Sequence, residues 1–327
     1  MKNNSFIIQS NMNEIFLNKN YTDLIKGLAM LFIVIGHIIQ ILVPSSILYY
    51  EQILSFICKI NIIGVGCFFF LSGYGNYLSI CKINNLKEQL FKCFSKIKRI
   101  YIVFFIALIT YILMYMLLHN GASLIDWNNF WFYFSTLTIP GYTIWYLKVQ
   151  IIAYLIMLIS LFARKHVLFI CFMGVIIYIL LSIYMHISAL LWQTILCFPL
   201  GCYVGKYRNE IIQYLNTNHT NNIKVGTTLI IITLTILCFC SGIISRMFLA
   251  VLGTITVLLI PLVYNKHCEK ELFIFLGKQS VYLYIYHWIY IAVIRYLPIS
   301  ILFKILFVML GVGTLLLLLY KKEKNNE

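Results

Sequence analysis

Long apolar runs separated by short polar segments make up most of the chain after residue 23. A helix that crosses a hydrocarbon core of about 30 Å needs about 20 mostly apolar residues. The run 167–205 contains no Asp, Glu, Lys or Arg, and we divide it at residues 185–188, where a tight hairpin is expected. The pattern then predicts ten membrane-spanning helices, at residues 24–43, 56–80, 100–118, 144–162, 167–185, 187–205, 225–243, 246–264, 279–297 and 299–319.

The composition excludes a soluble protein. Apolar and aromatic residues make up 62% of the 327 residues, charged residues 11%, and the mean hydropathy is +0.91. Soluble domains average about 45–50% apolar and about 25% charged residues, so this chain has too little charge to cover a surface in water, and disorder is excluded by the same numbers. We expect an all-α polytopic membrane protein with a transmembrane domain over residues 24–320, preceded by a segment 1–23 and followed by a tail 321–327.

The surplus of basic residues predicts how the helices are oriented. Lys and Arg number 25 against ten acids, which gives a net charge of +15. Such a surplus would indicate nucleic acid in a soluble protein, but cytoplasmic loops of membrane proteins also accumulate Lys and Arg. With a cytoplasmic N-terminus, 20 of the 25 basic residues fall on the cytoplasmic side of the ten helices. We therefore predict that both terminal segments are cytoplasmic, and we expect no nucleic-acid partner.

Cysteine usage predicts neither disulfides nor a metal site. The ten cysteines form no CxxC pair and no Cys/His cluster with metal-ligand spacing, and most lie inside apolar runs. In such surroundings cysteine behaves as a small apolar residue.

A polar stripe runs along the first predicted helix and includes a deep histidine. Asp23, Lys26 and His37 fall within about 60° of one helix face at about 100° per residue. Ionisable groups inside the bilayer are costly, so each is a candidate functional residue. A neutral imidazole can accept a proton from a hydroxyl as a general base. The alternative is a histidine that only forms an interhelical packing hydrogen bond.

The ninth predicted helix has a similar face. Gly277, Ser280, Tyr284 and His287 recur at intervals of three or four residues, which places them on one side of a helix. This face is either an aromatic and polar packing seam or part of a site.

A basic segment, residues 87–99, precedes the third predicted helix. It is compatible with an amphipathic helix on the anionic inner leaflet. It is also compatible with a phosphate clamp, because Lys96 and Arg99 share a helix face at the i, i+3 spacing.

Taken together, these motifs resemble those of the acyltransferase family 3 membrane proteins, in the correct order over residues 21 to about 290. Lys26 and Lys96 stand at positions where the family usually has Arg. The residues that carry the resemblance are DLIKG at 23–27 followed by His37, FFLSGY at 69–74, KIKRI at 96–100, WYL at 145–147, and GKQS at 277–280 with Tyr284 and His287.

The resemblance implies an enzyme of the cell (plasma or inner) membrane that transfers an acyl group, most often acetyl, from cytoplasmic acyl-CoA. The acceptor is a hydroxyl of an envelope glycan, a lipid-linked acceptor or another cell-envelope molecule. No permanently bound cofactor is implied; acetyl-CoA is the donor substrate. His37 and Asp23 are then expected to be catalytic, with His37 as general base or transient acyl carrier and Asp23 on the same polar face. The donor phosphates are expected to be bound by Lys26, Lys96 and Arg99. The substrate cavity is expected to be lined by Ser72, Tyr284 and His287.

Two other classes of protein remain open at this point. A transporter or flippase for a polysaccharide or lipid-linked sugar would also use buried polar groups, but the sequence has no inverted repeats with paired broken helices. A structural membrane subunit would leave both intramembrane histidines without a role.

Overall fold

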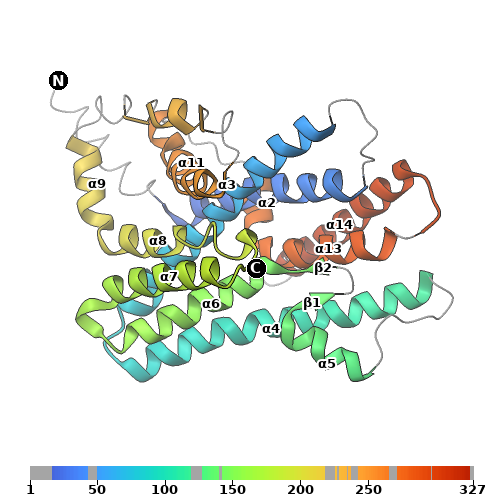
Figure 1. Ribbon diagram of the computed structural model, residues 1–327, viewed down its shortest axis with the longest axis horizontal. Coiled ribbons are helices and arrows are strands. Elements are labelled where there is room, and N and C mark those ends of the chain that lie inside the picture. Colours follow the sequence, from blue (N-terminus) through green and yellow to red (C-terminus); the bar gives the residue numbers. More distant parts are fainter. Residues whose placement is uncertain are drawn as a thin grey trace.

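The computed structural model describes residues 17–42, 50–118, 127–139, 142–217, 225–226, 228–233, 235–236, 242–264, 271–295 and 297–324 (Figure 1). Almost all of these residues are helical. The α-helices are α2 (Lys19–Leu42), α3 (Tyr50–Asn76), α4 (Leu86–Leu118), α5 (Trp127–Thr136), α6 (Trp145–Leu161), α7 (Val167–Tyr184), α8 (Cys197–Lys206), α9 (Arg208–Thr217), α11 (Ile243–Tyr264), α12 (Glu271–Lys278), α13 (Ser280–Ile294) and α14 (Ile301–Lys324). Three short helical turns are η1 (Tyr77–Cys81), η2 (Arg164–His166) and η3 (Ala189–Leu191).

The apolar helices confirm the predicted membrane class. By length and composition, five helical segments in the described part can cross a bilayer, and three shorter apolar helices coincide with three further predicted spans. The ten-span count and the orientation stay predictions. The five longer segments are Lys19–Gln40, Leu54–Cys81, Leu86–Leu118, Arg164–Tyr184 and Ile301–Lys321.

Helix α4 merges two elements that the sequence pattern separates. The basic segment 87–99 and the apolar run 100–118 form one helix of 33 residues. At about 1.5 Å per residue this helix is about 48 Å long, so it extends well beyond a core of about 30 Å. Figure 1 shows α6 lying between α4 and α7, with which it packs.

The segment 187–205 is not one continuous helix, so that prediction is wrong. The turn at 185–188 is present, but η3 is followed by irregular chain at 192–196, and α8 begins only at Cys197. Pro199 explains the break, because its ring would clash with the carbonyl group of Ile195 in a continuing helix. In α8, Pro199 falls in the first turn, where proline is tolerated. In the predicted span 225–243, residues 225–226, 228–233 and 235–236 are helical, whereas 227, 234 and 237–241 lie outside the described residues.

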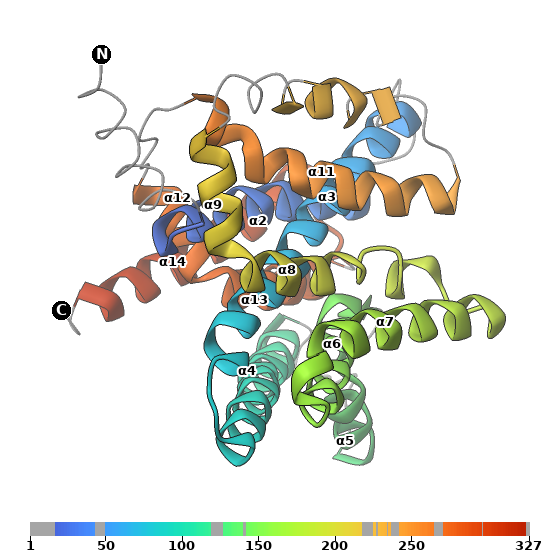
Figure 2. The ribbon, with the colours of Figure 1, turned by 90° about the vertical axis from the view of Figure 1, so that its left-hand side faces the viewer.

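Two close crossings hold the central helices together. A side-chain carbon added to Gly73 of α3 or to Gly201 of α8 would overlap a carbonyl oxygen of the other helix. Gly27 of α2 and Gly277 of α12 have the same relation. Small residues at both positions therefore let these backbones touch. Figure 2 shows α3 at the centre of the molecule, with α11 and α8 packed beside it.

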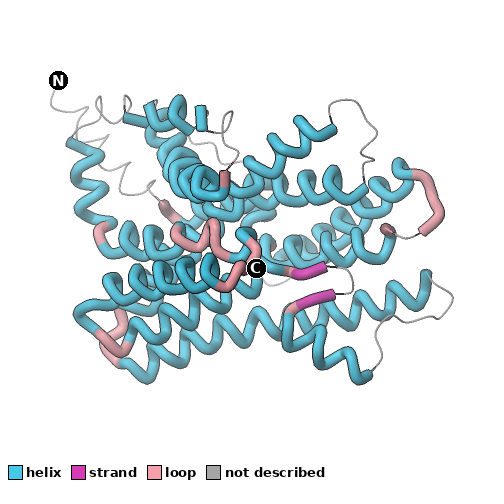
Figure 3. Tube along the Cα trace, viewed as in Figure 1, coloured by secondary structure: helices cyan, strands magenta, loops and turns pink. Residues whose placement is uncertain are grey.

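The only strands in the described residues are very short. β1 (Thr138–Ile139) pairs antiparallel with β2 (Tyr142–Thr143), shown in magenta in Figure 3. The pair leads directly into α6, whose first residue is Trp145.

Candidate active site

Two buried histidines from distant parts of the chain meet in the core. His37 lies on α2 and His287 on α13, and their exposed fractions are 9% and 0%. Nδ1 of His37 is 2.9 Å from Nε2 of His287, and the two ring planes lie within 3° of parallel. The two histidines that the sequence selects separately therefore form one hydrogen-bonded pair.

The surrounding hydrogen bonds assign the protons of this pair. Nδ1 of His287 is 2.8 Å from the carbonyl oxygen of Leu283, one turn earlier in α13. Because a carbonyl oxygen only accepts, Nδ1 of a neutral His287 carries the hydrogen and its Nε2 keeps the lone pair. Nδ1 of His37 then donates to His287, which leaves the lone pair on Nε2 of His37. This is the tautomer in which His37 can act as a base through Nε2.

His37 lines a cavity that is large enough for a substrate. The cavity holds about 510 Å³, and small-molecule sites commonly measure about 300–1,000 Å³. Trp145, Tyr284 and Trp288 contribute aromatic rings to its lining, and Arg246 contributes a cation. The ring of Trp288 lies 4.3 Å from that of His37, measured between centroids. We call this space the histidine cavity.

Amide side chains of the histidine cavity lack partners. Gln193 is 1% exposed, lies in the break before α8, and has no hydrogen-bond partner for either Oε1 or Nε2. Oδ1 of Asn61, on α3, is also unpartnered. Both residues line the cavity. An orphaned buried polar group costs about 1–3 kcal/mol, so these amides are candidates to pair with water or with a ligand in the cavity.

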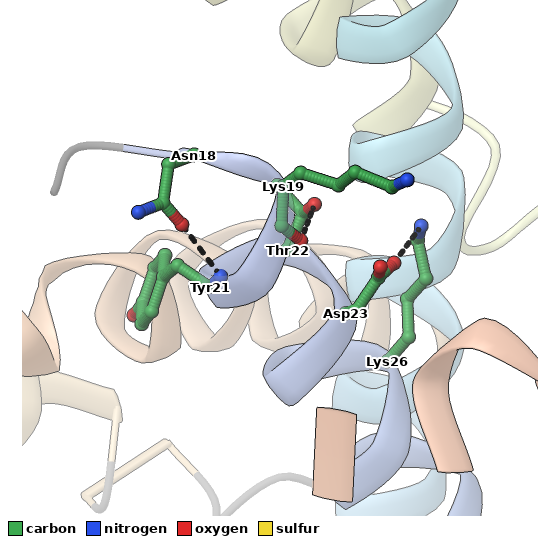
Figure 4. Close-up of polar contacts among 6 residues, drawn as sticks. All are labelled: Asn18, Lys19, Tyr21, Thr22, Asp23 and Lys26. Atoms are coloured by element: carbon green, nitrogen blue, oxygen red, sulfur yellow. Dashed lines mark hydrogen bonds and ion pairs between the residues drawn. The ribbon is translucent and has the colours of Figure 1, made fainter. Parts of the chain in front are cut away.

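Asp23 and Lys26 pair with each other near the start of α2 (Figure 4). The side chain of Asn18 accepts a hydrogen bond from the backbone N–H of Tyr21 at 2.7 Å and so caps the helix. Nζ of Lys26 donates to the buried carboxylate of Asp23 at 3.0 Å. Asp23 precedes His37 by 14 positions, which is about 21 Å along the helix axis. The structure therefore does not bring this ion pair to the histidines.

Lys96 and Arg99 also lie away from the histidine cavity. Nζ of Lys96 donates to Oδ1 of Asn76 and, at 3.1 Å, to Oγ of Ser79, so its charge is directed at the end of α3. Arg99 is exposed on α4. Neither residue belongs to the lining of the histidine cavity.

Ser72 belongs to a chain of hydrogen-bonded side chains between α3 and α6. Tyr146 donates to Oε1 of Gln150 at 3.1 Å. Nε2 of Gln150 donates to Oγ of Ser72 at 2.9 Å, and Ser72 donates to the hydroxyl oxygen of Tyr154 at 3.2 Å. Ser72 therefore lies behind the histidine cavity and is not part of its lining.

This chain continues at both ends. Tyr154 lies near Asn76, which accepts from Lys96 and whose Nδ2 has no hydrogen-bond partner. At the other end, the ring of Tyr146 packs 5.0 Å from that of Tyr284, which lines the histidine cavity. We call the set Tyr146, Gln150, Ser72, Tyr154 and Asn76 the polar line.

Among the polar residues that line the cavity, Gln193, Asn61 and Arg246 were not selected from the sequence. Gln193 could have been selected from the sequence, because it is a polar residue inside the run 167–205, which has no charged side chain. Asn61 and Arg246 had weaker signals, since both sit near the ends of predicted spans, where polar residues are ordinary.

The fold and the site define a helical membrane protein with a buried histidine pair at the edge of a cavity large enough for a substrate. The profile of the acyltransferase domain family, acyltransferase family 3, matches residues 19–320, nearly the whole chain. The chain belongs to this family and is a membrane acyltransferase. Neither the search of curated proteins nor the search of solved structures gives a match.

Proposed function

We propose that this protein transfers an acyl group, most simply acetyl, from cytoplasmic acyl-CoA to a hydroxyl group of a cell-envelope glycan. The observation that carries the proposal is the histidine pair, which leaves Nε2 of His37 as a free base at the histidine cavity. The family supplies the reaction class, and the pair supplies a proton acceptor at the point where an acceptor hydroxyl can enter.

The chemical step uses one nitrogen twice. Nε2 of His37 takes the proton of the acceptor hydroxyl while its oxygen attacks the thioester carbonyl carbon. The carbon–sulfur bond then breaks, and the imidazolium returns the proton to the departing CoA sulfur. His287 stabilises the positive charge on His37 by accepting from Nδ1, at 2.9 Å, throughout the step. His287 is thus a positioning residue for the base.

The lining of the histidine cavity suits a sugar. Carboxamides both donate and accept, so Gln193 and Asn61 are able to pair with hydroxyl groups that lie next to the reacting one. The rings of Trp145 and Trp288 offer apolar faces with a polar edge, on which a sugar ring can stack. With the predicted orientation, this cavity opens toward the outer side of the cell membrane, where envelope glycans occur.

Donor binding belongs to the opposite, predicted cytoplasmic side in this proposal. Lys26, Lys96 and Arg99 all lie toward that side, where they attract the phosphates of acyl-CoA. Arg99 offers a forked contact that a lysine cannot make, so it is the strongest of the three for a phosphate.

The test measures ester-linked acyl groups on envelope glycans in cells that carry His37→Ala or His37→Gln. General acid–base catalysis contributes about 10²–10⁴-fold, so both variants should lose almost all acyl transfer while the protein still inserts. Gln cannot rescue the activity because an amide has no titratable nitrogen. His186→Asn, at an exposed turn, is the matched control and should remain active.

The same experiment separates an enzyme from a transporter. Loss of the acyl ester with normal polymer export supports the proposal, whereas trapping of unmodified polymer inside the cell supports transport. Full acyl transfer by His37→Ala would rule out the proposed base.

A further inference from the structure

A second cavity lies at the opposite ends of the helices that bound the first. It holds about 480 Å³ and is lined by the residues after α3, by the last residue of α6 and by the first residues of α7. The histidine cavity instead contacts α3 between Cys58 and Val65, α6 at its first residue, and the chain that follows α7. The two cavities are therefore separated by the length of α6, about 24 Å.

The second cavity is strongly basic. Arg164, Lys165 and Lys206 line it, together with the uncharged polar side chains of Asn84 and Gln89. No acidic side chain belongs to this lining, and across the described residues none of the three cations forms an ion pair. Three unneutralised cations around one space attract a multiply charged anion. We call this space the basic cavity.

A helix terminus adds to the positive potential. Val167 and Leu168, the first two residues of α7, line the basic cavity. No side chain caps this 18-residue helix. The N–H groups of its first turn and the positive end of its dipole therefore face the same space as the cations, an arrangement that favours phosphate.

We propose that the basic cavity binds the phosphate-bearing adenosine end of the acyl donor, with Arg164, Lys165 and Lys206 as phosphate contacts. The inference rests on the proposed function for the identity of the donor. It assigns the main phosphate site to the α6–α7 turn and the end of α8, and leaves Lys96 and Arg99 on α4 outside its lining.

The polar line favours a nucleotide donor over a lipid headgroup, which has the same phosphate chemistry. It begins at Asn76, next to Tyr77 in the lining of the basic cavity, and ends at Tyr146, packed on Tyr284 of the histidine cavity. The arm that joins the nucleotide to the thioester contains amide groups, which need hydrogen-bond partners away from water. A row of half-buried hydroxyl and buried amide side chains between the two cavities supplies such partners, whereas a lipid tail needs none.

Two native cysteines make the inference testable in the purified full-length protein. Cys81 lines the basic cavity, Cys58 lines the histidine cavity, and both are partly exposed. The rate of N-ethylmaleimide labelling at each is measured by peptide mass spectrometry, with adenosine 3′,5′-bisphosphate as the probe. At about ten times its Kd, the probe should slow labelling of Cys81 about tenfold. Cys58 should be unaffected.

Variants and competing ligands decide the outcome. Arg164→Ala combined with Lys206→Ala should weaken the protection of Cys81 by about tenfold or more in probe concentration, because charge-assisted contacts are lost. Lys98→Ala, exposed on α4, should leave it unchanged. Protection of Cys81 by phosphatidylglycerol vesicles but not by the bisphosphate would overturn the nucleotide assignment. Protection by inorganic phosphate as strong as that by the bisphosphate would overturn it as well. No protection by any of the probes would overturn the site.

This test is separable from that of the proposed function. Protection of Cys81 without any acyl transfer from acyl-CoA would leave the anion site standing and the proposed reaction wrong. Loss of acyl transfer in His37→Ala with no protection of Cys81 would support the proposed reaction and rule out the anion site at the basic cavity.

Discussion

Replacing His287 by Leu removes the acceptor that holds His37 in its base tautomer. In the wild type, Nδ1 of His37 donates to His287 at 2.9 Å in a site where His37 is 9% exposed. In His287→Leu, that N–H would be buried without a partner, at a cost of about 1–3 kcal/mol. His37 then favours the other tautomer, with the hydrogen on Nε2. The population competent as a base falls by the corresponding factor, about 5- to 150-fold.

The assay is steady-state acyl transfer by purified protein in detergent. Because His287 is not part of the cavity lining, its loss should lower kcat and leave the KM for donor and acceptor nearly unchanged. His287→Gln should lose less, since Oε1 of a glutamine can accept from Nδ1 of His37. A His287→Leu change in a His37→Ala background should have no further effect, because the two residues act as a unit. Unchanged kcat in His287→Leu, or losses that multiply in the double variant, would refute the positioning role.

Three further outcomes are expected. Gly73→Ala should lower stability in detergent by about 1–3 kcal/mol, because its methyl group meets the backbone of α8. Gly75→Ala should leave stability unchanged, because its methyl group meets nothing within 4 Å. Equal melting temperatures for the two variants would contradict the close crossing. Gln193→Leu should raise the KM for the acceptor, because the amide that would pair with the acceptor is lost. It should not lower stability, because the amide that it removes is buried without a partner. An unchanged KM for the acceptor would show that Gln193 does not belong to the site. Cysteine labelling should find Asn85 on the cytoplasmic side and Asn129 outside; labelling of a cysteine at 129 from the cytoplasm would contradict the ten-span topology.

The helices could be predicted where hydrophobic length alone decides the structure. Eight predicted spans coincide with apolar helices because about 20 apolar residues have few alternatives in a bilayer. Hydrophobic length gave a wrong prediction at residues 187–205, where the helix is broken because the ring of Pro199 would clash with the backbone one turn earlier. The proline was visible in the sequence, but a uniformly apolar run concealed its effect. Non-helical chain is tolerated there because Gln193 lines a cavity.

The candidate site could be predicted only as separate residues. His37 and His287 stand out because a histidine in an apolar span is costly. Their pairing could not be predicted, because it depends on how α2 and α13 approach each other over 250 positions of sequence. Asp23 shares the helix face of His37, as predicted, but a shared face does not give proximity when the residues are four turns apart. The basic cavity likewise depends on the α6–α7 turn folding back beside the end of α8.

The glycine crossings have a consequence for how a long donor can enter. At Gly73 and Gly201, and at Gly27 and Gly277, helices touch through their backbones, so α2, α3, α8 and α12 form a rigid frame that cannot separate without losing these contacts. Between α3 and α6 the polar contacts are hydrogen bonds between side chains, at Ser72, Gln150 and Tyr154. An incoming amide can replace such bonds one at a time at little cost. The glycine crossings therefore form a fixed wall, and if the donor follows the proposed path, we expect the contact between α3 and α6 to be the one that opens for it.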